Sequence, residues 1–253
     1  MPVLLMTVWL TGCVQEELGS TPSPTGNGIR FTLTVPDVNL PSVSSRTMTG
    51  TGTAKKEDEI ETVDILVFDM SKTPAVYLEC VSATGVTQDL ADNSTVSFSA
   101  VLSPTTASTC IVVVANKELD NIVPGFIKGT TTKVEAMEKM LHAQTGKWLA
   151  DGSTTDGYTR IPMYGEKVIS KITPSMDPIT GINMKRMLAR IDIRNNSATS
   201  NFTVEEVYLA NYNTTGYIAP AWNTNGQVTD PAPDTPVLPV NSGKMTEEGD
   251  AIL

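Results

Sequence analysis

The residues that most often carry out chemistry in proteins are few in this chain, and their arrangement does not favour catalysis. His142 is the only histidine, and a nucleophilic triad needs such a base beside its nucleophile. We place His142 on the polar side of a predicted helix, where a surface role is the simpler interpretation. The carboxylates of Asp64 and Asp69 flank an apolar segment, and the sequence has no GxSxG, HExxH or phosphate-loop pattern. We therefore expect no catalytic residues and no enzyme.

The thiols and the remaining carboxylates also lack the spacing of a metal site. Cys80 and Cys110 lie in separate apolar segments, without a CxxC pair or a neighbouring histidine. Five acidic residues near the C-terminus lie in loose segments without EF-hand spacing: Asp230, Asp234, Glu247, Glu248 and Asp250. We expect neither a metal nor another cofactor. Two alternatives stay open for Cys80 and Cys110, namely two buried free thiols or a disulfide formed in an oxidising compartment.

Cys13 stands in a different context, directly after an apolar stretch at the start of the chain. Residues 3–10 are almost wholly apolar, and Leu10-Thr11-Gly12-Cys13 follows. A short apolar stretch that ends in small residues is typical of a secretory signal and is too short to span a bilayer. The order Leu-x-Gly-Cys resembles the lipobox of bacterial lipoproteins, in which the cysteine is acylated and becomes the first mature residue. We favour lipidation at Cys13 over the alternative of a buried N-terminal strand.

Composition favours a protein built from short strands joined by polar turns. Charged residues are 18% of the chain and the net charge is −10, so the surface lacks the excess of Lys and Arg that binds nucleic acid. Short apolar segments alternate with polar, glycine- and proline-rich turns, which predicts an all-β sandwich or barrel. No later stretch has the apolar length of a membrane helix.

One predicted strand stands apart from the others in the sequence. Apolar and polar residues alternate strictly from Ile29 to Val35, which places Ile29, Phe31, Leu33 and Val35 on one face. A loose Ser-, Thr- and Gly-rich linker containing Arg46 separates this strand from the next apolar segment. The strand is therefore a candidate for removal or exchange.

The body of the chain reads as further strands and one helix. The capping-box spacing of Thr132 and Glu135 predicts the start of the helix, whose apolar face would contain Val134, Met137, Met140 and Leu141. We predict strands over residues 63–69, 76–81, 96–102, 110–116, 160–166, 168–172, 183–194 and 202–209.

These segments predict two Greek-key-like β-sandwich domains, with the short helix in the first domain. Residues 1–12 would be the signal peptide, and residues 13–46 the tether and the removable strand. Residues 47–189 would form the first sandwich. Residues 190–253 would begin a second sandwich that lacks its later strands.

The order of these segments resembles the fimbrillin family, the type V pilin subunits of Gram-negative fimbriae. The resemblance rests on the cysteine of the lipobox, the strand 29–35, Arg46 and a series of later segments. These later segments are residues 59–68 (EIETVDILVF), 111–116 (IVVVAN), 161–165 (IPMYG) and 185–191 (KRMLARI).

The resemblance implies how such a protein is assembled. The precursor would be held at the outer membrane by lipid on Cys13, and an arginine-specific protease would cut between Arg46 and Thr47. The cut would remove the lipid and the first strand together, and a β-strand of the next fimbrial subunit would fill the vacated groove. The implied partners are thus other fimbrial subunits, the protease and the outer membrane, in a cell-surface fimbria that supports adhesion.

Other interpretations follow from the same residues. Arg46 would be an ordinary linker arginine in an uncleaved outer-membrane lipoprotein that anchors a fimbria or binds a glycan or host ligand. The chain ends before the C-terminal donor strand that the resemblance implies. We expect either a truncated reading frame or a subunit that accepts a strand without donating one.

Overall fold

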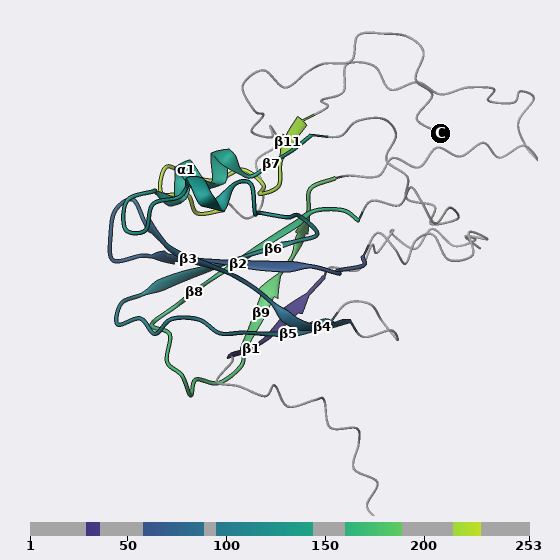
Figure 1. The fold of residues 1–253 in the computed structure, drawn as a ribbon, viewed down its shortest axis with the longest axis horizontal. Helices are drawn as coiled ribbons and strands as arrows, with labels where there is room; N and C mark the ends of the chain where they lie inside the picture. Colours follow the sequence, from purple (N-terminus) through teal and green to yellow (C-terminus); the bar gives the residue numbers. More distant parts are fainter. Residues whose placement is uncertain (1–28, 36–57, 89–94, 144–159, 189–214, 229–253) are drawn as a thin grey trace, which may run out of the picture.

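A computed structural model describes residues 29–35, 58–88, 95–143, 160–188 and 215–228 of the 253-residue chain. Two sheets form the body of this part (Figure 1). Sheet A has four strands in the order β4 (Thr84–Gln88), β5 (Thr95–Ala100), β1 (Ile29–Thr34) and β9 (Ile179–Asn183). Sheet B has five strands in the order β10 (Lys185–Arg186), β8 (Met163–Ile169), β6 (Thr109–Ala115), β2 (Val63–Asp69) and β3 (Val76–Ser82).

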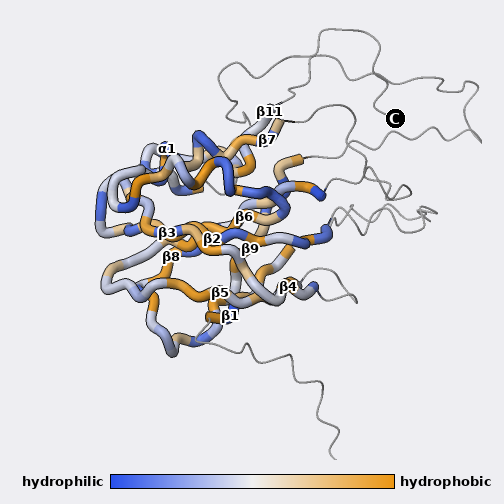
Figure 2. The backbone as a smooth tube through the Cα atoms, in the orientation of Figure 1, coloured by the Kyte–Doolittle hydropathy of each residue, from blue (hydrophilic) through white to orange (hydrophobic). Residues whose placement is uncertain are grey.

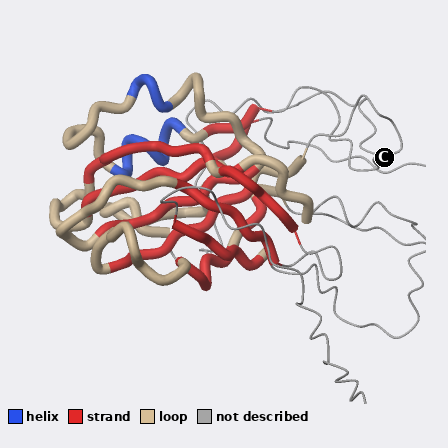
Figure 3. The backbone as a smooth tube through the Cα atoms, turned by 60° about the horizontal axis from the view of Figure 1, so that its bottom comes forward, coloured by secondary structure: helices blue, strands red, loops and turns tan. Residues whose placement is uncertain are grey.

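Sheet B is the middle of three layers. Sheet A packs on one face of it, and helix α1 (Lys133–Lys139) lies on the other face (Figure 1). A short 3-10 helix (Val123–Gly125) precedes α1. A pair of short strands, β7 (Leu141–Ala143) and β11 (Thr215–Tyr217), follows α1. The strands lie in stacked layers and the helical segments sit at one side of the stack (Figure 3).

Two apolar cores fill the spaces between these layers, and β2 contributes to both of them. Val63, Ile65 and Val67 pack toward sheet A, while Leu66 and Phe68 pack toward α1. A strand that is buried on both faces needs a continuous apolar sequence, which both β2 and the central strand β6 have. Figure 2 shows this apolar colouring along the inner strands. The predicted all-β sandwich with one short helix is confirmed for the described residues.

The predicted capping box is present, and the predicted apolar face is confirmed at Met137 and Met140, which are fully buried, but wrong at Val134. Glu135 N donates to Thr132 Oγ1, and Thr132 N donates to the Glu135 carboxylate at 2.7 Å. The helix buries Lys133, Ala136 and Met137, whereas Val134 is only half-buried. An ion pair satisfies the Lys133 ammonium inside the protein, so a charged residue takes a position that periodicity assigns to an apolar one.

His142 and Leu141 were also misplaced. The helix ends at Lys139, and both residues belong to strand β7, where His142 pairs with Gly216 of β11. The helix stops there because Met140 leaves helical geometry, with φ −79° and ψ 77°. His142 is therefore a strand residue and does not lie on a helix face.

Two strand predictions need correction, and two others fall outside the described residues. Residues 163–169 form one strand, β8, in place of the two short strands predicted over 160–172. The long strand predicted over 183–194 is broken at Met184, where the chain passes from β9 in sheet A to β10 in sheet B. The strand predicted over 202–209 and the predicted domain boundary at 189/190 lie outside the described residues and stay predictions.

Candidate functional site

The candidate site is the position of strand β1 inside sheet A, which we call the β1 slot. It is bounded by β5 on one side and β9 on the other. Strand β1 runs antiparallel to β5, with Phe31 opposite Phe98, and parallel to β9, with Phe31 opposite Ile179. Backbone groups of β1 are thus paired on both edges. The strand that the linker separates from the body in sequence is an internal strand of the folded sheet.

The alternating face of β1 is buried as the sequence predicted. Ile29, Phe31, Leu33 and Val35 are at most 4% exposed, while Arg30 and Thr34 are exposed. Full burial of such a side chain contributes about 1.5–3 kcal/mol relative to its exposed state. Four of them correspond to roughly 6–12 kcal/mol before entropy costs, an upper range. The β1 side chains are therefore a large share of the core between the two sheets.

The aromatic ring of Phe31 makes the most specific contact in the slot. It stacks on the ring of Phe98 from β5, with centroids 5.0 Å apart and ring planes 9° apart. Leu33 lies opposite Val96 and Ile29 opposite Ala100 on the same neighbouring strand. The side chains of β5 that lie opposite β1 thus differ in size, from a small alanine to an aromatic ring to a branched valine.

The chain re-enters the described structure at Asp58, close to sheet B, and polar side chains hold this entry. Gln88 Oε1 accepts from Ile60 N at 3.1 Å, and Gln88 Nε2 donates to Asp58 O at 2.8 Å. Asn116 Nδ2 donates to Glu59 O at 2.8 Å and to Ile161 O at 3.0 Å. The Oδ1 atom of the same side chain accepts from Glu61 N at 3.0 Å. Asn116 has a left-handed φ of 58°, a conformation that asparagine adopts more often than most residues.

Ion pairs reinforce the same entry segment. The Arg160 guanidinium contacts Glu59 at 3.1 Å and Glu61 at 2.6 Å, and Arg186 pairs with Asp58. These partners come from the approach to β8 and from β10, so they belong to sheet B. The polar contacts that hold the described entry to β2 do not involve β1.

The remaining sequence-predicted residues do not gather into a second site. Cys13, Arg46 and Thr47 lie outside the described residues and stay predictions. Asp64 accepts a hydrogen bond from Ser82 at 2.7 Å. The hydroxyl and backbone N–H of Ser71 lower the pKa of Asp69. Both carboxylates thus have structural partners.

The cysteines of the described part are free thiols. Cys110 is fully buried in β6 and Cys80 is half-buried in β3. Burial raises the pKa of Cys80 to about 12 and that of Cys110 to about 11. Across the described residues, no cluster of His, Cys, Asp and Glu is arranged to hold a metal ion, and no helix is long and apolar enough to cross a membrane.

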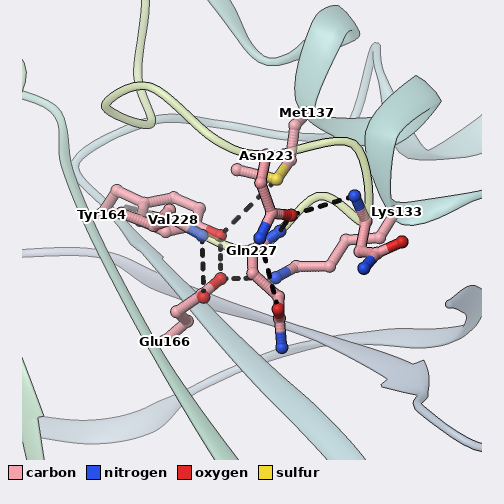
Figure 4. Close-up of polar contacts among 8 residues, drawn as sticks. Lys133, Met137, Tyr164, Glu166, Asn223, Gln227 and Val228 are labelled. Carbon is pink, nitrogen blue, oxygen red and sulfur yellow. Dashed lines mark hydrogen bonds and ion pairs between the residues drawn. The ribbon is translucent and has the colours of Figure 1, made fainter. Parts of the chain in front are cut away.

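A polar cluster that sequence reasoning missed lies on the other face of sheet B (Figure 4). The Glu166 carboxylate accepts from Lys133 Nζ at 2.5 Å, from the Tyr164 hydroxyl at 2.7 Å and from Val228 N at 3.1 Å. Burial and the adjacent Glu166 charge raise the pKa of Tyr164 well above its usual range, so the phenol is a donor. No sequence motif predicts this cluster, because its members are distant in sequence. A buried lysine is also rarely expected.

A family model matches residues 23–250, and its description is fimbrillin-A associated anchor proteins Mfa1 and Mfa2. The chain belongs to this family. The family is one of fimbrial accessory proteins rather than enzymes, and it implies a location in a fimbria at the cell surface. The resemblance to fimbrillins that the sequence indicated is confirmed at this level.

Two solved structures are similar to this member of the anchor family. One is a fimbrial assembly protein from Parabacteroides distasonis, with 13% identity and a TM-score of 0.41, which covers 81% of this chain and 72% of that one. The other is described as putative polysaccharide binding proteins from Bacteroides thetaiotaomicron, with 13% identity and a TM-score of 0.35. That match covers 62% of this chain and 47% of the other. Among curated proteins, none matches this chain.

Proposed function

We propose that this fimbrial accessory protein joins a fimbria by exchanging strand β1 for a strand of a neighbouring subunit. In the proposed sequence of events, lipid on Cys13 holds the precursor at the outer membrane. Cleavage between Arg46 and Thr47 then frees the lipid together with β1, and the β1 slot accepts a donated strand. The observation that carries this proposal is the internal position of β1 in sheet A, with partners on both edges and four buried side chains.

The geometry supports the proposal because an empty β1 slot is unfavourable. Loss of β1 would leave backbone donors and acceptors of β5 and β9 without their partners, and would open an apolar groove between the sheets. A donated strand with apolar residues at alternate positions would restore both the hydrogen bonds and the buried side chains. Head-to-tail contacts of this kind do not close on themselves, so they extend into a filament.

The polar contacts of the entry segment fit the same proposal. Asn116, Gln88 and Arg160 hold residues 58–61 without using β1. A cut in the linker would therefore leave the start of β2 in place. Residues 58–61 would keep these contacts to β4, to Asn116 and to Arg160 while the slot is vacated.

A second candidate function is that of a fimbrial anchor that keeps its lipid and its own β1. The description of the family as anchor proteins favours it. In this case Arg46 would not be cut, and β1 would serve only as a structural strand of sheet A. The protein would then contact the fimbria through another surface.

Limited proteolysis separates the two candidates. The chain from Cys13 onward would be treated with an arginine-specific protease at limiting dose, with Arg46→Gln as the matched control. We expect one early cut after Arg46, absent from the control, followed by exchange of β1 for an added peptide of residues 28–36. Mass spectrometry identifies the cut and fluorescence anisotropy of a labelled peptide follows the exchange.

The result that overturns strand exchange is equally concrete. If Arg46 resists cleavage in the folded protein, or if β1-free protein does not bind the peptide of residues 28–36, the anchor function replaces it. A peptide of the same composition with its apolar residues moved out of alternation tests whether binding follows the pattern.

A further inference from the structure

One short segment connects the β1 slot to the opposite side of the molecule. Residues 179–187, which we call the crossover segment, begin as β9 beside β1. Met184 N then donates to Thr34 O of β1 at 2.8 Å. Immediately afterwards Lys185 pairs with Tyr164 of β8, and Met187 N donates to Pro162 O at 3.0 Å. The crossover segment therefore leaves the slot and joins sheet B within a few residues.

A second segment lies across the far face of sheet B. Residues 215–228, which we call the strap, start as β11 beside β7. Ile218 N donates to Met140 O at 3.1 Å, and Ile218 and Ala219 are at most 3% exposed. The strap is thus docked on the end of α1 and on the second core.

Glu166 holds the far end of the strap. Its carboxylate accepts from Val228 N while it is also bound by Lys133 and Tyr164 (Figure 4). Gly226 adopts φ +73° directly against Lys133, where an added Cβ would lie 3.1 Å from the lysine side chain. The strap, the helix and β8 therefore meet at one half-buried carboxylate.

The crossover segment touches the strap and the strand that holds it. The Met187 methyl group packs against Gly216 of the strap. A Cβ added at Gly216 would lie 2.8 Å from Met187 Cε. On β8, a Cβ at Gly165 would lie 2.7 Å from Met184 Sδ and 2.8 Å from Ile182 Cγ2. Gly165 sits between Tyr164 and Glu166, so the crossover segment packs against the part of β8 that binds the strap.

We infer that docking of the strap is coupled to occupation of the β1 slot through the crossover segment. The inference rests on the proposed strand exchange. Within the described residues, β1 is the one strand paired with β9, so an empty slot leaves β9 without a strand partner and Met184 N without Thr34 O. The β9 end of the crossover segment then keeps contacts to β8, such as the bond from Lys167 Nζ to Thr180 O, but it loses its strand pairing, and its contacts to Gly216 and β8 weaken. A filled slot restores them.

Such coupling would let a subunit report whether its slot is filled. Because energetic coupling between two sites is reciprocal, a loosened strap must also weaken strand binding in the slot by the same factor. Coupling of this kind commonly amounts to roughly 5–150-fold in affinity.

Hydrogen exchange with mass spectrometry tests the first direction. Strap amides would be compared in the intact chain, in cut protein freed of β1, and in cut protein with the peptide of residues 28–36 added. We expect exchange of residues 215–228 to rise when β1 is absent and to fall again with peptide, while β6 stays protected. Unchanged strap exchange in peptide-competent, β1-free protein overturns the coupling and leaves strand exchange intact.

The reciprocal direction uses variants of the strap attachment. Glu166→Gln should loosen the strap and weaken binding of the peptide to the empty slot by about 5-fold or more. Thr224→Ala, at an exposed strap position, should leave peptide affinity unchanged. Equal affinities for wild type and Glu166→Gln, measured with strap exchange raised in the variant, contradict the coupling.

A measurement on the uncut chain covers the case in which no peptide binds. Leu33→Ala weakens β1 in its slot, and Val63→Ala weakens the same core from β2. We expect Leu33→Ala to raise hydrogen exchange of β1 and of the strap together. Val63→Ala should not raise the exchange of β1 or of the strap more than it raises the exchange of β6. Failure of the peptide to bind, taken alone, contradicts strand exchange. Unchanged hydrogen exchange of the strap in Leu33→Ala contradicts the coupling.

Discussion

The rings of Phe31 and Phe98 stack across the β1–β5 pair with centroids 5.0 Å apart. This contact joins the separated strand to the body of sheet A, and it lies inside the buried core. Aromatic pairs contribute about 0.5–1.5 kcal/mol beyond the area that they bury. The stacked pair is therefore expected to contribute to the stability with which β1 is bound in sheet A.

Loss of the Phe31 ring should destabilise the intact protein strongly. We expect Phe31→Ala to lower the free energy of unfolding by about 3–5 kcal/mol, the usual cost of such a cavity. A double-mutant cycle with Phe98→Ala should give a coupling of about 0.5–1.5 kcal/mol. Urea unfolding measures both, and Arg30→Ala on the exposed face should stay within about 0.5 kcal/mol. Additive effects of the two phenylalanine variants would mean that the stacking contributes nothing.

A methyl group at Gly165 should disturb the contact between the two sheets. The added Cβ would lie 2.7 Å from Met184 Sδ and 3.1 Å from Asn183 O. The sulfur can move, but the backbone oxygen is held within β9, so we expect Gly165→Ala to cost about 1–3 kcal/mol. Gly125→Ala is the matched control, since its Cβ would meet only Lys139 Nζ at 3.9 Å. Thermal unfolding should separate the two variants, and equal melting temperatures would contradict the close packing.

Removal of the Lys133 charge should leave Glu166 without its ion pair. Lys133 is fully buried, and breaking such a pair from one side commonly costs about 3–5 kcal/mol. The 17% exposure of the Glu166 side chain places the expected loss for Lys133→Met at the lower end of that range. The double variant Lys133→Met with Glu166→Gln should lose less than the sum of the two single variants. Additivity in denaturant unfolding would show that the pair is not coupled.

The helix cap predicts a specific pH dependence. Hydrogen bonds from the Thr132 backbone and hydroxyl lower the pKa of Glu135 below its usual 4.5. A carboxyl with a depressed pKa in the folded state stabilises the protein above its unfolded pKa, and this contribution is lost as pH falls through the folded value. The stability difference between wild type and Glu135→Gln should therefore be constant near neutral pH and shrink below about pH 4.5. A difference that stays constant to pH 3 would argue against the cap.

The two described thiols should react slowly in the native protein. Burial raises the pKa of Cys80 to about 12 and of Cys110 to about 11, which leaves little reactive thiolate at pH 8. In a Cys13→Ser background, iodoacetamide should modify both residues quickly in urea and slowly without it. Mass spectrometry of the modified peptides distinguishes the sites. Fast native labelling of Cys110 would contradict its burial in β6.

Sequence patterns were reliable where one local rule decides the structure. The continuous apolar runs gave β2 and β6, strict alternation gave the buried face of β1, and the Thr132–Glu135 spacing gave the helix cap. They failed where distant residues decide. Lys133 is buried only because Glu166 lies beside it, and Met184 breaks a predicted strand because its amide binds Thr34. Strand β4, largely polar and without an apolar face, gave no signal.

The buried face of β1 was predictable from the sequence, but the surroundings of the strand were not. Alternation identified Ile29, Phe31, Leu33 and Val35, but nothing local shows that their neighbours are β5 and a parallel β9. The residues that hold the entry segment, such as Asn116, and the Glu166 cluster unite segments far apart in the chain. Such contacts depend on the topology, which a single sequence does not reveal.

The parallel pairing of β1 with β9 sets an order of events during biogenesis. Strand β1 is synthesised first among the described strands, yet the strand that covers its second edge begins only at Ile179. Sheet A cannot close until most of the described chain has emerged, and pairing over such a distance is slow because loop closure precedes the gain from contacts. Until then the apolar face of β1 is exposed to non-native association. We therefore expect export and folding of this protein to depend on a chaperone that shields its N-terminal strand.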